Sequence, residues 1–207
     1  MVLVIATRNS GKRAEFAHLL AGLGLTIRSL AEFPRAPEVP EESGSYHENA
    51  RVKAVTIARY TGLPALADDS GLEVDALGGA PGVRSARFAG AAGDDQRNLT
   101  LLLQRLEATP SAQRTARFRC VIVVARPDGA TLAVEAVCEG VIATHPAGTA
   151  GFGYDPVFLL PELGRTFAQL PTEEKHQRSH RGRACAMLRP QLLEFLGSQA
   201  GANPKPS

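Results

Sequence analysis

The first thirty residues constrain the fold more than any other part of the chain. Residues 2–6 form a continuous apolar run, as expected of a buried strand. The polar segment 9–11 interrupts this run, and apolar side chains at helical spacing follow it, at Phe16, Leu19, Leu20 and Leu23. Residues 26–30 have the pattern of a second strand. A strand, a turn, a helix and a second strand in this order are the usual opening of an α/β fold.

The rest of the chain continues with alternating helices and strands. We expect helices over 45–60, from about 95 onward, and over 179–196, the first capped by Ser45 and Glu48. A short strand over 65–67 should deliver Asp68 and Asp69 at its C-terminal end, and a second strand should pass through Leu72. Two long strands over 115–125 and 131–142 should form a hairpin that turns at 127–129. We therefore expect residues 1–198 to form one domain, either a single unit or two small lobes that share a core, and a flexible tail over 199–207.

Composition excludes several classes of protein. The chain has 207 residues, of which 44% are hydrophobic, so it can bury a sizeable core. A formal net charge of +2 does not by itself support a nucleic-acid surface. There is no C-x-x-C pair that would indicate a structural zinc site. Cys120 and Cys138 could form a disulfide across a hairpin, but we expect free cysteines, because free buried cysteine is the common case in the cytosol. Without a signal-peptide pattern or a long apolar segment, we expect a cytoplasmic protein that binds neither membrane nor nucleic acid.

The turn between the first strand and the first helix is the first candidate for chemistry. Its residues are Thr7, Arg8, Asn9, Ser10, Gly11 and Lys12. The free N–H groups and the positive dipole end of a helix N-terminus attract an anion, and Lys12 adds a charge for a phosphate oxygen. An ordinary helix cap by Asn9 or Ser10 explains the same residues. The G-x-x-x-x-G-K-[ST] spacing of a Walker A loop is missing.

The segment Asp68-Asp69-Ser70-Gly71 is the second candidate. Two adjacent carboxylates in a half-buried place repel each other unless a cation neutralises them. Magnesium would do so, and a carboxylate there could also take a proton from an attacking water. These residues are equally good turn formers, so a solvated turn is an alternative. An acidic loop could complete a metal site or could simply be solvated, and it contains Glu38, Glu41 and Glu42.

Two further segments have the composition of a ligand pocket. The first is Gly151-Phe152-Gly153-Tyr154-Asp155-Pro156, where the aromatic rings could stack on a flat base and Asp155 could accept a hydrogen bond from a base edge or a sugar. The alternative is a turn anchored by its aromatic side chains. Basic side chains gather at the start of the last helix, at Lys175, Arg178, His180 and Arg181. Cations at a helix N-terminus oppose its dipole, so an anionic or polar ligand would explain them, as would a solvated patch.

Taken in order, these segments resemble one family of nucleotide hydrolases, the inosine/xanthosine triphosphate pyrophosphatases. The resemblance covers about residues 2–196. It rests on Thr7-x-Asn9-x-x-Lys12, Glu48-Asn49-Ala50 followed by Lys53, Ala67-Asp68-Asp69-Ser70-Gly71-Leu72, Gly78-Gly79-x-Pro81-Gly82-x-x-Ser85-Ala86-Arg87, Gly151-Phe152-Gly153-Tyr154-Asp155-Pro156, and Glu174-Lys175 with Ser179-His180-Arg181. Each motif is weak alone, but six motifs in order at matching spacing are highly specific.

The resemblance implies a fold, a reaction and a set of roles. The fold would be an elongated, two-lobed α/β fold with a central long mixed β-sheet flanked by helices and a substrate cleft between the lobes. The reaction would be Mg²⁺-dependent hydrolysis of the purine nucleoside triphosphates ITP, dITP and XTP to the monophosphate and pyrophosphate, usually by a homodimer. Asp69 would be the catalytic base and, with Glu41, a metal ligand, while Ser70 would touch the substrate. The triphosphate would contact Thr7, Arg8, Asn9, Ser10, Gly11, Lys12 and Lys53, and the base pocket would contain Phe152, Gly153, Tyr154, Asp155, Lys175, His180 and Arg181.

Several assignments stay open at this point. Arg8 replaces a small residue of the family pattern, and it could contact phosphate or point to solvent. His176 stands where the family commonly has Asn. The choice of Glu41 over Glu42 and the part played by Asp68 are not determined. Two other functions remain as alternatives: a nucleotide pyrophosphatase of the septum-formation-inhibitor type, which prefers pyrimidine or modified nucleotides, and a nucleotide-binding sensor without catalysis.

Overall fold

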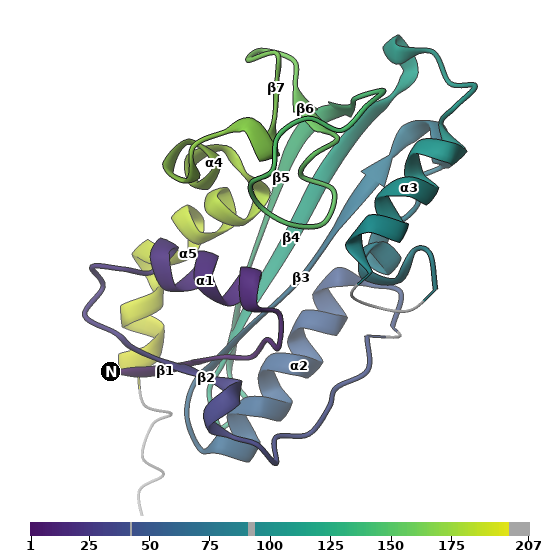
Figure 1. Ribbon diagram of the computed structural model, residues 1–207. Coiled ribbons are helices and arrows are strands. Elements are labelled where there is room, and N and C mark those ends of the chain that lie inside the picture. Colours follow the sequence, from purple (N-terminus) through teal and green to yellow (C-terminus); the bar gives the residue numbers. More distant parts are fainter. Residues whose placement is uncertain (42, 91–93, 199–207) are drawn as a thin grey trace, which may run out of the picture.

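One mixed sheet forms the centre of the computed structural model, which describes residues 1–41, 43–90 and 94–198 (Figure 1). In these residues the sheet has seven strands, in the order β2-β1-β3-β4-β5-β6-β7. The strands are β1 (Val2–Ile5), β2 (Thr26–Ser29), β3 (Ala65–Val74), β4 (Thr115–Ala125), β5 (Thr131–Ile142), β6 (Phe158–Leu160) and β7 (Arg165–Thr166). β1 pairs in parallel with β2 and β3, and all the other pairs are antiparallel. The β-α-β opening expected from the sequence therefore forms one edge of the sheet.

Helices cover both faces of this sheet. The α-helices are α1 (Ser10–Leu19), α2 (Tyr46–Thr61), α3 (Asp95–Arg105), α4 (Thr172–Arg178) and α5 (His180–Gly197). Short 3-10 helices are η1 (Leu30–Glu32), η2 (Asp75–Leu77), η3 (Gly82–Arg87), η4 (Ser111–Gln113) and η5 (Phe167–Gln169). α2 packs on β3 and β4, while α5 packs on β4 and β5 (Figure 1). The predicted fold class, a long mixed sheet flanked by helices, is confirmed.

Alternation along β4 shows how the two faces are filled. Cys120 and Ile122 pack in a core cluster with residues of α5, whereas Val121 and Val123 pack with residues of α2. All four side chains are buried, because the strand lies in the middle of the sheet with a helix on each side. Cys120 is one of three buried free cysteines, as expected from the absence of close cysteine pairs.

The long hairpin turns where the sequence predicts it. β4 ends at Ala125 and β5 begins at Thr131. Between them, Gly129 has a positive φ of 94°, and the Asp128 carboxylate accepts a hydrogen bond of 2.9 Å from the Ala130 N–H. Asp and Gly are common in tight turns for these two reasons. The hairpin gives the protein its long axis (Figure 1).

The predicted end of the strand before the paired aspartates is wrong. β3 continues without interruption from Ala65 to Val74, so Asp68 and Asp69 lie in the middle of a ten-residue strand. Its partner β4 explains the difference, because Asp68 lies opposite Ile122 and Asp69 opposite Val121 in an unbroken antiparallel ladder. A polar run with turn-forming residues therefore stays extended when a long neighbouring strand satisfies its backbone.

The last predicted helix, over 179–196, corresponds to α5, and a separate helix, α4, directly precedes it. α4 ends at Arg178, Ser179 accepts a hydrogen bond of 3.1 Å from the Gly182 N–H, and α5 begins at His180. Gly182 allows the helices to meet closely, since a Cβ atom there would lie 1.5 Å from the His176 carbonyl oxygen. Glu42 and the expected tail over 199–207 lie outside the described residues. Among the helices described, none is long and apolar enough to cross a membrane.

Candidate active site

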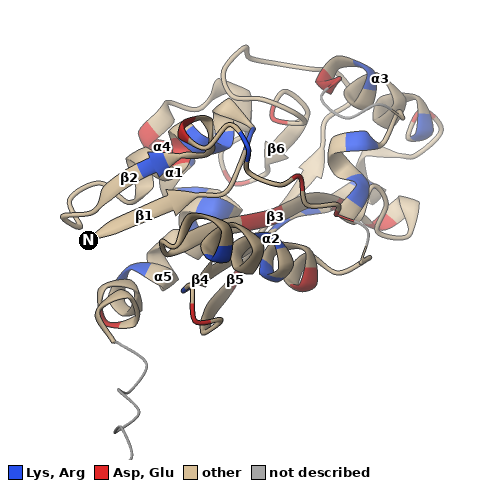
Figure 2. Cartoon of the chain, turned by 90° about the horizontal axis from the view of Figure 1, so that it is seen from below, with Lys and Arg blue, Asp and Glu red and all other residues tan. Residues whose placement is uncertain are grey.

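Side chains from several elements meet in a cavity beside the middle of β3. Figure 2 shows the acidic stretch of this strand in red near the centre of the molecule. The cavity is lined by Asn9, Lys12, Glu41, Asp69, Ser70, Gly71, Val83, Ser85, Ala86, Asp95, Phe118, Phe152, Gly153, Tyr154, Asp155, Lys175, His180 and Arg181. Twelve of these residues were predicted site residues, so the fold brings most of the sequence motifs to one place.

Asp68 is a fully neutralised carboxylate. Its Oδ2 atom lies 2.9 Å from Lys12 Nζ and 3.1 Å from Arg181 Nη2, and it accepts a hydrogen bond of 3.1 Å from Ser70 Oγ. Burial alone would raise the pKa of Asp68, but Lys12, Arg181 and Lys53 outweigh it and hold the pKa well below its usual range. The Asp68 side chain is therefore a buried anion that holds α1 and α5 against β3.

Asp69 has the opposite environment. It is 3% exposed, and it accepts hydrogen bonds from Asn49 Nδ2 at 2.8 Å and from the Ser70 N–H at 3.0 Å. Within the described residues, it takes part in no ion pair. Burial raises the pKa of Asp69 to about 6, and the nearby Glu41 carboxylate adds to this effect, although the bond from Asn49 opposes it. Asp69 thus gains and loses a proton close to neutral pH.

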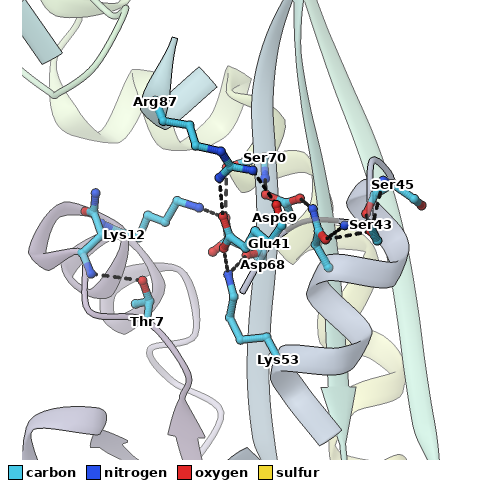
Figure 3. Close-up of polar contacts among 12 residues, drawn as sticks. Thr7, Lys12, Glu41, Ser43, Ser45, Lys53, Asp68, Asp69, Ser70 and Arg87 are labelled. Carbon is cyan, nitrogen blue, oxygen red and sulfur yellow. Dashed lines mark hydrogen bonds and ion pairs between the residues drawn. The ribbon is translucent and has the colours of Figure 1, made fainter. Parts of the chain in front are cut away.

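Glu41 lies at the same cavity and is surrounded by cations. It forms ion pairs with Lys53 and with Arg87, as the close-up in Figure 3 shows. Lys53 Nζ also donates to the backbone carbonyl of Asp68, at 3.2 Å. Glu41 and Asp69 are therefore two oxygen-rich groups on the same cavity wall, and a hard divalent cation prefers such groups as ligands.

The basic side chains of α4 and α5 are compensated by carboxylates of the protein itself. Lys175 Nζ lies 2.9 Å from Glu15 Oε1 and 2.6 Å from Asp155 Oδ2. Arg181 pairs with Glu15 as well as with Asp68. The charge of these cations is therefore balanced inside the protein. Neither an external anion nor a solvated patch is needed to explain them, because Glu15 on α1, which the motifs did not include, supplies negative charge. Burial raises the pKa of Glu15, but Arg181 and Lys175 outweigh this and lower it overall.

Four aromatic side chains also line the cavity and are called the aromatic wall below: Phe118, Phe152, Tyr154 and His180. The rings of His180 and Phe118 are stacked with centroids 4.6 Å apart, and burial, followed by the charges of Arg181 and Lys175, holds the pKa of His180 well below its usual range. Lys175 Nζ lies 5.1 Å from the centre of the Phe152 ring. The buried Tyr154 hydroxyl donates to the Ser85 carbonyl at 2.9 Å. The wall therefore combines flat apolar surfaces with polar edges.

The turn after β1 forms an ordinary helix cap and also reaches the cavity. Asn9 accepts a hydrogen bond of 2.9 Å from the Lys12 N–H at the start of α1, and Thr7 Oγ1 accepts one of 3.2 Å from the Asn9 N–H. Thr7, Arg8 and Ser10 line a neighbouring depression, and Arg8 Nη2 donates to the Ala36 carbonyl at 3.1 Å. Gly11 permits close packing, because a Cβ atom there would lie 2.8 Å from the Phe152 ring.

The loop after β3 packs against the aspartate segment through Ser85. Ser85 Oγ accepts from the Leu72 N–H at 2.8 Å and donates to the Gly82 carbonyl at 2.6 Å. A Cβ atom on Gly71 would lie 2.2 Å from the Gly82 oxygen, so this position requires glycine. The loop that follows β3 therefore helps to shape the cavity, as far as its described residues show.

Among the residues of the site to which the sequence prediction gave no role are Glu15, Asn49 and Ser85. Asn49 and Ser85 stand inside quoted motifs, and their hydrogen bonds to β3 could have been suspected from that position. Glu15 gave a different signal, because an acidic residue directly precedes Phe16 on the apolar side of a predicted helix. A charged residue beside a buried position is rarely tolerated unless it is paired.

Together, the mixed sheet and this cavity define a class of protein. A carboxylate that titrates near neutral pH, a second acidic group and several lysines and arginines around one cavity are typical of an enzyme that acts on phosphate compounds. More specifically, the chain belongs to the Ham1 family, whose family model matches residues 3–191. The resemblance found in the motifs is therefore confirmed.

Curated relatives match nearly the whole chain. A protein from Geobacillus kaustophilus named dITP/XTP pyrophosphatase is 52% identical over 197 residues, which are 95% of this chain and 97% of that protein. A protein of the same name from Geobacter sulfurreducens is 52% identical over 190 residues, which are 92% of this chain and 96% of that protein. Such identity over full-length chains shows common descent with a closely similar structure.

Solved structures agree with this assignment. A HAM1 protein from Coxiella burnetii has a TM-score of 0.84 and 43% identity, covering 94% of this chain and 99% of that chain. A nucleoside-triphosphatase / dITP/XTP pyrophosphatase from Mycobacterium abscessus has a TM-score of 0.74 and 45% identity, covering 92% of this chain and 100% of that chain. The seven-stranded fold described above is thus the fold of this family.

Proposed function

We propose that this protein hydrolyses deaminated purine nucleoside triphosphates, namely ITP, dITP and XTP, to the nucleoside monophosphate and pyrophosphate. Removing these nucleotides would keep them out of DNA and RNA. The observation that carries the proposal is the contrast within β3, where Asp68 is neutralised by two cations and Asp69 has no counter-ion among the described residues. A buried carboxylate that has no counter-ion, although lysines lie nearby, is better explained by a catalytic role than by a contribution to stability. The names of the full-length relatives support the same reaction.

In the proposed reaction, Asp69 is the general base. Its carboxylate accepts a proton from a water molecule, the water oxygen attacks the α-phosphorus, and the bond to the β-phosphate oxygen breaks so that pyrophosphate leaves. A pKa of about 6 is well placed for this task, because the group is deprotonated at neutral pH but still basic enough to accept a proton. Asn49 holds the carboxylate in one orientation through its 2.8 Å bond to Oδ2.

The cations of the cavity would bind the triphosphate. Lys12 lines the cavity, Lys53 lies at its edge beside Asp68, and both would stabilise the charge on the phosphate oxygens. The N–H groups at the start of α1 would add further donors. We assign Thr7, Arg8, Ser10 and Gly11 to the outer part of this subsite because they line neighbouring depressions rather than the main cavity.

Asp69 and Glu41 are the residues that would hold a divalent cation, which we propose is Mg²⁺. The donor set fits, since both groups offer carboxylate oxygens and Asp69 lacks a positive partner in the described part of the chain. When bound, such a cation neutralises phosphate oxygens and makes the attacking water more acidic. It would also lower the pKa of Asp69, since an opposite charge favours the ionised carboxylate.

The aromatic wall would recognise the base. Hypoxanthine and xanthine carry an oxygen at position 6 where adenine has an amino group, so hydrogen-bond donors near Lys175, His180 and Arg181 would favour them. Buried donors that face an amino group lose their hydrogen-bond acceptor, and that loss can give large discrimination between substrates. Phe152 would stack on the base, and the hydrogen bonds of Tyr154 and Asp155 would hold the loop that carries Phe152 in place.

One substrate panel tests this proposal. ITP, dITP, XTP, GTP, ATP and dTTP would be incubated with the protein, with and without Mg²⁺, and the products separated. We expect pyrophosphate and monophosphate from the first three substrates only, in the presence of Mg²⁺, and almost no turnover by Asp69→Asn. Stepwise release of orthophosphate would contradict cleavage between the α- and β-phosphates. Preference for dTTP would favour the septum-formation-inhibitor type, and binding without turnover would favour a sensor.

We further propose that residues 1–198 act as one two-lobed domain and that the protein works in the cytoplasm as a homodimer. The placement of the cavity between residues of α1, η3 and α5 supports a cleft between lobes. Gel filtration with light scattering would test the dimer, since a monomeric mass at working concentration would contradict it.

A further inference from the structure

Outside the proposed active site, two histidines and one glutamate from different helices meet at the surface. They are His18 at the end of α1 and Glu173 and His176 on α4. Each of them offers one ligand atom, and the three atoms all lie within 4.8 Å of one another. Among the described residues, no other group of three His, Cys, Asp or Glu side chains meets this condition.

We propose that His18, Glu173 and His176 bind a transition-metal ion, with Zn²⁺ as the chemically best match. Two imidazoles and one carboxylate are a common protein ligand set for zinc, with a water in the fourth position. Hard cations such as Mg²⁺ prefer oxygen ligands and octahedral geometry, so this site should discriminate against them. The site is therefore chemically different from the carboxylate pair Asp69 and Glu41.

The distances suit such a site after small side-chain movements. Ligand atoms about 2.1 Å from a tetrahedral zinc lie roughly 3.4 Å from one another. His18 Nε2 and Glu173 Oε2 are already 3.2 Å apart. The side chains of His18 and Glu173 are 46% and 71% exposed, so both can move toward the buried His176 without disturbing the core. Glu173 and His176 are three residues apart on one helix and therefore share a face.

The contact between the two imidazoles also points to a shared ligand. The rings of His18 and His176 lie 4.4 Å apart, and His176 is 7% exposed. The two rings therefore lie close enough for one ion to contact both, and a neutral imidazole is the form that binds metal. Burial, followed by the charge of His18, lowers the pKa of His176, which is consistent with this state.

No hydrogen bond competes for His176 within the described part of the chain. Its Nδ1 atom is buried and has no partner there. Metal binding by this ring would therefore cost it no hydrogen bond to the described residues. The ordinary explanation, an exposed pair between His18 and Glu173, leaves the buried His176 without a function. The neighbouring Lys175 does not oppose a cation strongly, because it is neutralised by Glu15 and Asp155.

A metal ion here would cross-link α1 and α4 beside the proposed active site. Glu15 lies one turn before His18 on α1, Lys175 lies directly before His176 on α4, and the two side chains form a buried ion pair of 2.9 Å. By linking α1 and α4 at the surface, the metal would stabilise the ion pair between Glu15 and Lys175. We therefore expect zinc to stabilise the fold and to leave the chemistry at Asp69 unchanged, so the inference does not depend on the proposed reaction.

The test measures Zn²⁺ binding by isothermal titration calorimetry, using untagged protein at neutral pH in excess Mg²⁺. We expect one Zn²⁺ per chain, a rise in melting temperature of about 5 °C at a hundredfold excess over Kd, and visible absorption bands when Co²⁺ replaces Zn²⁺. His18→Ala, at an exposed position, should weaken binding at least tenfold, and His176→Asn should do the same.

The matched control is His47→Ala, which removes an exposed histidine of α2 that does not belong to this cluster. It should bind Zn²⁺ like the unaltered chain. The inference is overturned if the unaltered chain shows no stoichiometric Zn²⁺ binding, or if His18→Ala binds as tightly as His47→Ala. Circular dichroism of each variant shows that it is folded before binding is compared.

Discussion

Replacing the two adjacent aspartates of β3 by asparagine, one at a time, should change the stability of the protein in opposite directions. Asp68→Asn and Asp69→Asn alter the same atoms at neighbouring positions, and both side chains are buried. Asp68 forms ion pairs with Lys12 and Arg181, whereas Asp69 has no ion pair among the described residues. The negative charge therefore stabilises the folded state at the first position and destabilises it at the second.

The pKa of Asp69 gives the size of its effect. The difference between about 6 in the folded protein and 3.8 in the unfolded chain corresponds to about 3 kcal/mol. Above pH 6 the folded state holds a carboxylate that is more stable in the unfolded chain, so Asp69→Asn should raise the free energy of unfolding by up to about 3 kcal/mol. The gain should shrink as the pH falls through 6 and vanish below 3.8, where both states are protonated.

Asp68→Asn should behave differently because it breaks a buried pair. Removing one partner of such a pair leaves uncompensated charge and typically costs about 3–5 kcal/mol. Lys12 would lose the carboxylate 2.9 Å from its Nζ atom, and Arg181 would keep only Glu15. We therefore expect this variant to be clearly less stable than the unaltered chain at neutral pH.

Urea denaturation followed by circular dichroism measures both effects, because the chain contains no Trp for fluorescence. The three proteins would be compared at pH 8 and pH 5 in a chelator, and again in excess Mg²⁺. Magnesium should stabilise the unaltered chain more than Asp69→Asn, since it supplies the cation that Asp69 lacks. If Asp69→Asn were less stable than the unaltered chain at pH 8, or if both variants lost stability alike, the division of roles between the two aspartates would be refuted.

Three further predictions concern the same region. Gly71→Ala should cost about 1–3 kcal/mol or more, because its Cβ would lie 2.2 Å from the Gly82 oxygen, and an unchanged thermal melt would contradict this. Ser85→Ala should cost about 1–3 kcal/mol and speed hydrogen exchange at the Leu72 amide, whose N–H loses its 2.8 Å acceptor; exchange at the normal rate would refute it. For hydrolysis of ITP, kcat/KM should fall as the pH drops through about 6, because Asp69 must be deprotonated to act as the base. Saturating Mg²⁺ should move this fall to lower pH. A pH profile of kcat/KM that stays flat at every Mg²⁺ concentration would exclude Asp69 as the base.

Local sequence patterns determined the opening β-α-β unit, the hairpin at Asp128 and Gly129, and the helices that begin after Ser45 and Asp94. These features depend on apolar periodicity, turn residues and caps, which act over a few neighbouring positions. The order and spacing of the motifs were also enough to identify the family, because six short segments in register are rarely shared by chance.

Only the tertiary structure decided what each charged group of the site does. Asp68 and Asp69 look equivalent in the sequence, and their difference arises because Arg181, 113 positions away, and Lys12 both reach Asp68. The strand through both aspartates likewise stays extended because β4 pairs along its whole length, which local propensity cannot foresee. The cations of α4 and α5 required Glu15 from the other end of the chain for their charge balance. Electrostatic roles therefore follow from long-range proximity and burial, which a local pattern does not contain.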